Sequence, residues 1–212
     1  DSGGTFVHNT TRSYTSPFPA GTHNFDANST FIFRGSSSIG TTVVFSSRTF
    51  GNLTIESSSG AYTVNAATGT GTVTINGNLS IGATGAGTVS WTLATGTTSP
   101  FNIAGNLSIG TGSAITFPEI PITLNGNLVN NGTMTINATS GIFTFNGTSA
   151  TVSGSATAAF GGGFTINAAK AVSLSTGMSV ASGKTGTVNG TLNCGTSTVS
   201  GAGNFTLAAG AT

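Results

Sequence analysis

Carboxylates are the side chains in this sequence most able to support catalysis, and there are four: Asp1, Asp26, Glu56 and Glu119. A pair of carboxylates can cleave a glycosidic bond when the two groups lie about 5 to 9.5 Å apart. Glu56 and Glu119 are separated by about three turns of the repeat described below, which places them too far apart for such a pair. We therefore expect no catalytic residue and no enzyme activity.

Metal-ligating residues are equally sparse. The two histidines, His8 and His23, have no cysteine or acidic partners at the spacing of a zinc site. The Gly-rich nonapeptides with repeated Asp that bind calcium in β-helices are also absent from the sequence. We expect no metal and no cofactor. The single cysteine, Cys194, alternates with Leu192, so we expect it to face the core as a small hydrophobic residue.

The charge of the chain excludes several classes of partner. Only 4% of the 212 residues are charged, against roughly 25% in an ordinary globular protein. The five Lys and Arg residues are scattered, whereas binding to nucleic acid needs clustered positive charge. No run of about 18 apolar residues predicts a membrane span. Hydrophobic residues make up 36% of the chain and recur periodically, which argues against disorder.

These residues lie on an internal repeat. A pattern of apolar, Thr, apolar, Asn and Gly is clearest at Phe143–Gly147 and recurs at steps of 19 to 28 residues. Its fifth position is occupied by Gly35, Ser57, Gly77, Gly105, Gly126, Gly147, Ala168, Gly190 and Ala209. A period of about 20 to 50 residues is typical of stacked-repeat proteins.

The strands around each repeat are short, alternate apolar and polar residues, and are bounded by Gly, Asn and Ser. The sequence therefore predicts an all-β fold, a right-handed parallel β-helix (β-solenoid) of about nine turns, or rungs, of roughly 21 residues. Residues 29–212 would form the solenoid, and residues 1–28 an N-terminal cap or docking segment. The 28-residue step before Gly105 predicts an outward loop at residues 83–87 or 94–100.

The repeat also predicts internal contacts. We expect Asn78, Asn106 and Asn127, each following a bend glycine, to stack as an amide ladder. The bend glycine would supply a positive φ. An aromatic spine would line the interior, formed by Phe31, Phe33, Phe101, Phe143, Phe145, Phe164 and Phe205.

The polar residue between the two apolar positions of each rung forms an outward column. Its candidate surface-binding residues are Thr54, Thr74, Thr123, Thr144, Thr165, Thr187 and Thr206, with Asn102 in the remaining rung. This column resembles the threonine arrays on flat β-solenoid faces of ice-binding proteins. The residue two positions earlier in each rung is irregular, however, and a single column also follows from β-propensity and hydroxyl pairing. Ten Asn-x-Ser/Thr sequons occur, and a repeat rich in Asn and Thr generates them by composition.

A longer internal repeat relates residues 31–37 to residues 143–149. Its first copy ends with Gly-Asn-Leu-Thr-Ile at residues 51–55. This order of motifs, across residues 30–209, resembles the repetitive β-helical surface proteins and adhesins of Gram-negative bacteria. The resemblance implies an extracellular or cell-surface structural or adhesive module. Its partners would be further repeats, other copies of itself, or glycans or another cell surface. Ice binding and carbohydrate binding are the alternatives.

Overall fold

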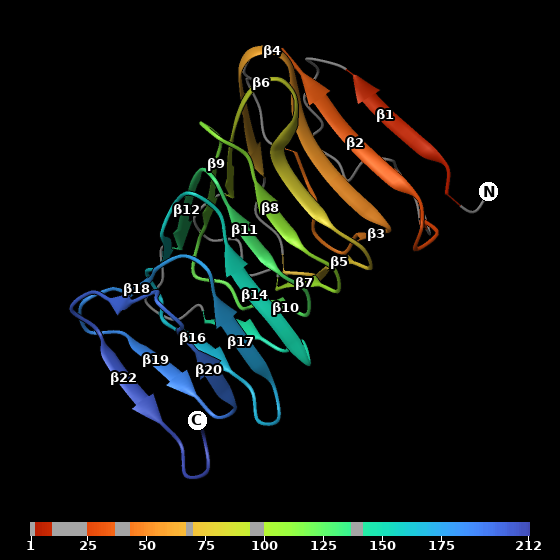
Figure 1. The fold of residues 1–212 in the computed structure, drawn as a ribbon. Coiled ribbons are helices and arrows are strands. Elements are labelled where there is room, and N and C mark those ends of the chain that lie inside the picture. The colour runs from red at the N-terminus through yellow and green to blue at the C-terminus, as the bar shows by residue number, and fades with distance from the viewer. Residues whose placement is uncertain (1–2, 10–24, 37–42, 67–69, 94–99, 137–141) are drawn as a thin grey trace.

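The structure is a computed structural model that describes residues 3–9, 25–36, 43–66, 70–93, 100–136 and 142–212. These residues form strands, and the described part of the chain contains no helix. Each strand pairs in parallel with strands one turn away, so the chain winds into a β-solenoid of about eight turns, about 22 residues apart (Figure 1). The predicted parallel β-solenoid is therefore confirmed.

The first face of the solenoid is sheet A. Its strands stack in the order β1 (Thr5–Asn9), β2 (Thr30–Gly35), β4 (Asn52–Ala66), β6 (Leu79–Leu93), β8 (Leu107–Ile109), β11 (Leu128–Asn130), β14 (Ser149–Ser153), β17 (Ala171–Leu174) and β20 (Thr191–Asn193). β1 lies within the segment predicted as a cap, and its parallel pairing with β2 continues the ladder. Residues 10–24 of that segment lie outside the described residues.

The second face is sheet B, which carries the threonine column. Its order is β3 (Thr49–Phe50), β5 (Val73–Ile75), β7 (Phe101–Ile103), β10 (Ile122–Leu124), β13 (Phe143–Phe145), β16 (Phe164–Ile166), β19 (Thr185–Val188) and β22 (Asn204–Leu207). In every strand from β5 to β19 the residues before and after the central position are buried, so the central residue points outward.

The third face is built from several pieces. The second halves of β4 and β6 bend onto it and are followed by β9 (Ala114–Phe117) and β12 (Thr133–Ile136). It continues next to β12 with sheet C, formed by β15 (Ala158–Phe160), β18 (Met178–Val180) and β21 (Val199–Ser200). The three faces enclose one hydrophobic core.

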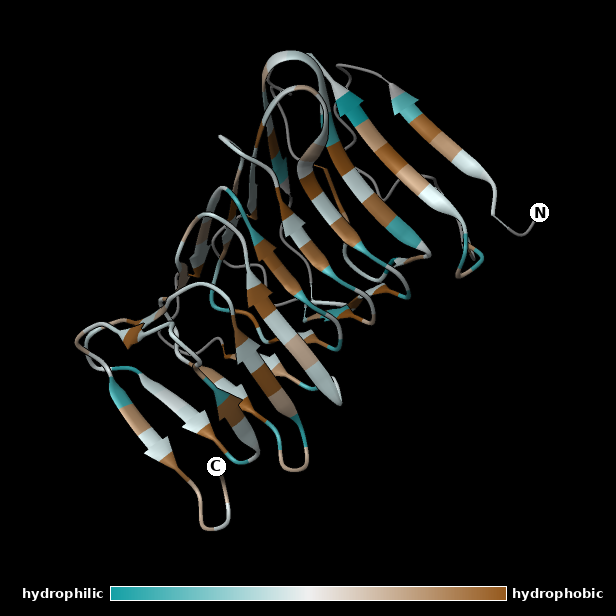
Figure 2. Cartoon of the chain, in the orientation of Figure 1, coloured by the Kyte–Doolittle hydropathy of each residue, from teal (hydrophilic) through white to brown (hydrophobic). Residues whose placement is uncertain are grey.

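The core follows from the alternation along each strand, which Figure 2 shows as hydrophobic residues separated by polar ones. Six of the seven phenylalanines predicted to line the interior are buried: Phe31, Phe33, Phe101, Phe143, Phe145 and Phe164. Trp91 and Tyr62 are also fully buried, and burial raises the pKa of the Tyr62 phenol. Cys194 is partly buried against the same core, as its alternation predicts.

Phe205 departs from the prediction because it is 45% exposed. Its side chain lies on the inner face of β22, where its ring centroid is 6.3 Å from that of Phe164. β22 is the last strand of sheet B, so no further rung of the described chain covers it. The Phe205 side chain therefore points toward the core, as predicted, but it is not buried.

The bend between sheets B and A requires glycine for a reason other than the predicted one. The backbone at Gly105, Gly126 and Gly147 does not adopt a positive φ. A Cβ atom added at any of the three would instead lie within 3.0 Å of backbone atoms of the rung below, a separation that real Cβ atoms essentially never show. Close approach of consecutive rungs therefore selects glycine at this bend.

The corner that follows Ile81 holds the predicted insertion. Ten positions separate Ile81 from Trp91 in β6, whereas six separate their partners Ile109 and Ile115, so β6 carries four more residues here than the rung above. The rung below has a corner of similar length, with nine positions between the partners Ile55 and Val64 of β4. The additional residues of β6 fall at residues 83–87, one of the two predicted places. Residues 94–99, in the other, lie outside the described residues.

Candidate functional site

Six of the seven predicted threonines line up on the outer face of sheet B. The strand registers place Thr74 beside Asn102, and the column continues through the rungs above it with Thr123, Thr144, Thr165, Thr187 and Thr206. Each side chain is half-buried or exposed. Parallel strands are about 4.8 Å apart, so the column presents one hydroxyl or amide group at about that interval.

Thr54 does not belong to this column, which corrects the prediction. It lies in sheet A, where it is aligned with Ile32 and Ser80. Its place beside Thr74 is taken by Thr49 of β3. The error arises because both sheets use the same apolar-polar-apolar strand, and the first two markers of the repeat belong to sheet A.

A second ordered column, which the sequence analysis missed, runs beside the threonines. Asn125, Asn146 and Asn167 each follow a column threonine by two residues. The Asn146 Nδ2 group donates to Asn125 Oδ1 at 3.0 Å, and Asn167 Nδ2 donates to Asn146 Oδ1 at 2.9 Å. The signal was the Asn of the repeated pattern itself, two positions after the threonine rather than before it.

The two columns together form an uncharged lattice of hydrogen-bonding groups. Rungs are separated by about 4.8 Å, and each asparagine lies one residue beyond the end of the strand that carries its threonine. Four consecutive rungs carry the same Thr-x-Asn pair, at Thr123, Thr144, Thr165 and Thr187. The amide ladder fixes its side chains before any ligand arrives, which lowers the entropic cost of binding an ordered partner.

The predicted ladder at the neighbouring bend is confirmed. The backbone N–H of Asn106 donates to Asn78 Oδ1 at 2.9 Å, and that of Asn127 donates to Asn106 Oδ1 at 2.8 Å. The ladder extends below to Asn52, whose Oδ1 accepts the Asn78 N–H at 2.9 Å, and ends above at the Thr151 N–H. These side chains satisfy bend amides that the strand ladders leave without an acceptor.

Replacing Asn106 by Ala is expected to lower the free energy of unfolding by about 1 kcal/mol, because the Asn127 amide loses its acceptor. Urea denaturation followed by circular dichroism measures the change. Asn102→Ala is the control, since Asn102 is exposed on sheet B and lies outside both amide ladders. Equal destabilisation of the two variants would contradict a stabilising role for the ladder.

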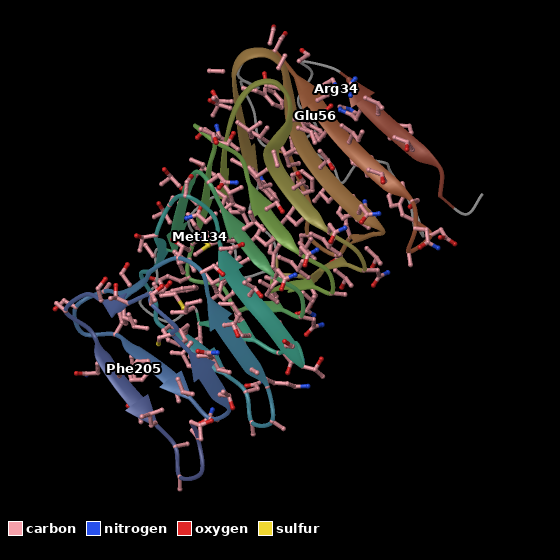
Figure 3. The ribbon with its side chains drawn as sticks, in the orientation of Figure 1. Arg34, Glu56, Met134 and Phe205 are labelled. Atoms are coloured by element: carbon pink, nitrogen blue, oxygen red, sulfur yellow. The ribbon has the colours of Figure 1, made fainter. Side chains whose placement is uncertain are left out.

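The buried acid, Glu56, takes part in a structural contact. Its Oε1 accepts a hydrogen bond from Arg34 Nε of the rung below, and its Oε2 accepts one from Thr84 Oγ1 of the rung above at 2.7 Å. Figure 3 shows Arg34 and Glu56 at the corner of β2 and β4. Both carboxylate oxygens are thus engaged. Asp26 and Glu119 are exposed, and the described residues contain no cluster of three or more groups that could hold a metal ion.

In the described part of the chain, no helix is long and apolar enough to cross a membrane. Comparison of this sequence and structure with protein-family models, curated proteins and solved structures finds no match.

Proposed function

We propose that this chain is a non-enzymatic, extracellular β-solenoid with a structural or adhesive role, a module of a bacterial surface protein or filament. The observation that carries the proposal is the pair of asparagine ladders, in which seven asparagines in two columns hydrogen-bond from rung to rung through their side-chain amides. Such columns reinforce stacked strands. A scaffold that must keep its shape under tension gains directly from them.

The composition supports the same proposal. A surface with few charges has little electrostatic repulsion toward a second surface, and only 4% of these residues are charged. One of the four acidic residues, Glu56, forms an ion pair with Arg34 within the scaffold, so its charge is neutralised there. The resemblance of the repeat to surface adhesins points in the same direction.

Two measurements test the proposal. Protease treatment of intact cells that produce the protein should remove it, while a cytosolic marker survives. Beads that display well-separated single copies of the chain should be retained on glycan-coated or cell-coated surfaces under flow, and beads that carry the heat-denatured chain should not. Protection of the chain inside intact cells would overturn the extracellular role, and equal retention of both bead types would overturn the adhesive one.

A second candidate, binding of ice or of an ordered polysaccharide, is favoured by the Thr-x-Asn lattice of sheet B. Thr144→Lys places a long charged side chain within the lattice, and Thr54→Lys makes the same change on sheet A. If the lattice binds, thermal hysteresis or pull-down on an insoluble polysaccharide falls at least about 10-fold in the first variant and is unchanged in the second. Absence of both activities in the wild-type protein removes this candidate.

A further inference from the structure

The corner between sheet A and the third face is longer in β6 than in the rungs above it. It spans ten positions in β6, from Ile81 to Trp91. The residues aligned with these two are six positions apart in the rung above, and the equivalent pair in the next rung is four positions apart. The β6 corner lies next to the corner of β4, with which it pairs (Figure 1). The solenoid therefore has a step above β6, with described rungs on both sides of it.

A hollow of about 450 Å³ occupies this step. Sites for small ligands commonly have volumes of about 300 to 1,000 Å³. The β6 corner forms one side of the hollow, and Gly110, Thr111 and Asn131 of the two rungs above form the other. None of the residues that line it is charged or aromatic. The groups that can recognise a ligand here are therefore peptide groups, hydroxyls and one carboxamide.

The backbone of the β6 corner forms no strand pair on the side of the hollow. β6 pairs with the rung above up to Ile81 and again from Ser90, and no strand of the described chain pairs with the intervening residues on that side. Gly85 and Gly87 line the hollow at this place, and the lack of a side chain lets a ligand approach their peptide groups closely. The corner thus offers both donors and acceptors of hydrogen bonds.

Asn131 supplies an oriented amide group on the opposite side. Its Oδ1 accepts a hydrogen bond from the Ser155 N–H at 2.9 Å, which fixes the direction of the carboxamide. Its Nδ2 can donate two hydrogen bonds. Within the described residues, Nδ2 donates to no protein group. Thr88 and Thr111 are exposed and add a hydroxyl group each.

The lining excludes charged and apolar ligands. An anion would need a positive charge in the hollow, and the nearby Arg34–Glu56 ion pair lines a separate hollow on the β4 side of the corner. An apolar ligand would need walls of large hydrophobic side chains, which are absent from this lining. A neutral, polar ligand remains.

The shape of the corner excludes an added peptide strand. Strand addition requires peptide groups at the regular spacing of a β-strand. Gly82 and Gly85 have φ values of 57° and 96°, and the register between β4 and β6 shifts twice at this corner. The hydroxyl groups of a sugar both donate and accept hydrogen bonds, so they do not depend on that regular spacing.

We propose that this hollow binds a neutral sugar unit of a glycan. Asn131 Nδ2 donates to an oxygen of the sugar, and the peptide groups of the β6 corner exchange hydrogen bonds with its hydroxyls. The inference rests on the adhesive role proposed above and deepens it by naming the site and the class of ligand.

Nuclear magnetic resonance of the 212-residue chain tests the site. Methyl glycosides of neutral sugars, added one at a time, should shift the amide signals of residues 82–88, 110–112 and 131 with a millimolar dissociation constant. N-acetylneuraminic acid, a charged sugar, should not. Absence of shifts with every neutral glycoside, or equal binding of the charged sugar, would overturn the proposal.

Two variants test the residues. Asn131→Ala should weaken binding about 10-fold, and Thr111→Val, which removes one exposed hydroxyl, about 3-fold. Asn193→Ala is the matched control, because Asn193 Oδ1 likewise accepts a backbone N–H, that of Gly195 at 3.1 Å, but lies outside the hollow. Equal affinities of the Asn131 and Asn193 variants would reject the assignment of Asn131.

Retention of beads under flow distinguishes failure of this site from failure of the proposed function. Beads that carry the Asn131→Ala chain should be retained less than wild-type beads, and an excess of the glycoside that shifts these amides should release the wild-type beads. Undiminished retention of the variant would overturn the role of the hollow and leave adhesion standing. Equal retention of folded and heat-denatured chains would instead remove the adhesive role itself.

Discussion

Phe145→Ala is expected to lower the free energy of unfolding by about 3 to 5 kcal/mol, the range found when a fully buried phenylalanine is truncated. Phe145 is fully buried on sheet B. Its ring lies 5.0 Å from Phe143, 5.8 Å from Phe160 and 6.4 Å from Phe164, measured between centroids. Removing it leaves a cavity that neighbouring rungs fill poorly, because their spacing is fixed by the strand ladders.

Denaturant unfolding of the wild-type and variant chains measures this loss. Ile142→Ala is the control, because it truncates a large aliphatic side chain that is 46% exposed three positions away. We expect the control to change stability by less than about 1 kcal/mol. Similar midpoints for the Phe145 variant and the wild-type chain would show that Phe145 is not a core residue.

Gly126→Ala is expected to cost about 3 kcal/mol, although it adds a single methyl group. The new Cβ atom would lie 2.5 Å from the carbonyl carbon of Gly105 and 2.7 Å from Asn106 Oδ1. Relief requires the bend to separate from the rung below. That movement strains the Asn127–Asn106 bond of the ladder as well.

Gly177→Ala separates this steric effect from the intrinsic effect of replacing glycine. A Cβ atom at Gly177 would meet its nearest neighbour at 3.5 Å, an ordinary contact, and its φ is not positive. We expect Gly177→Ala to lie within about 1 kcal/mol of the wild-type chain. If thermal denaturation shows the two alanine variants to be equally stable, rung-to-rung approach does not select the bend glycine.

The fold was predictable because two periods in the sequence agree. Alternation along Val73–Ile75 or Phe143–Phe145 fixes which face is buried, and the return of the same triplet after about 21 residues requires stacking. The Asn78, Asn106 and Asn127 ladder followed from the same register. Each of these predictions depended on positions within one rung and on their repetition.

The sequence-based predictions were wrong in two situations. In one, two faces of the solenoid share the same residue pattern; in the other, contacts with a neighbouring rung determine the role of a residue. Leu53–Ile55 of sheet A reads like Val73–Ile75 of sheet B, so Thr54 was assigned to the wrong column. The requirement for glycine at Gly126 comes from atoms of Gly105 one turn away, which sequence spacing does not reveal. The exposure of Phe205 likewise depends on whether a neighbouring rung packs over it, and the apolar-polar-apolar pattern of Phe205–Leu207 does not show this.

The two asparagine ladders overlap where Asn125 and Asn127 flank a single bend, and the second ends at Asn167. Beyond Asn167, in the described part of the chain, side chains of β21 and of the loop before it form two longer hydrogen bonds to the rung below. The Ser197 hydroxyl donates to the Leu174 carbonyl at 3.4 Å, and the Ser200 hydroxyl donates to the Met178 carbonyl at 3.3 Å. In a stacked repeat, local opening depends on the contacts between neighbouring units. Peptide hydrogens in the turn that holds β21 should therefore exchange with solvent faster than those in the turns that the asparagine ladders span.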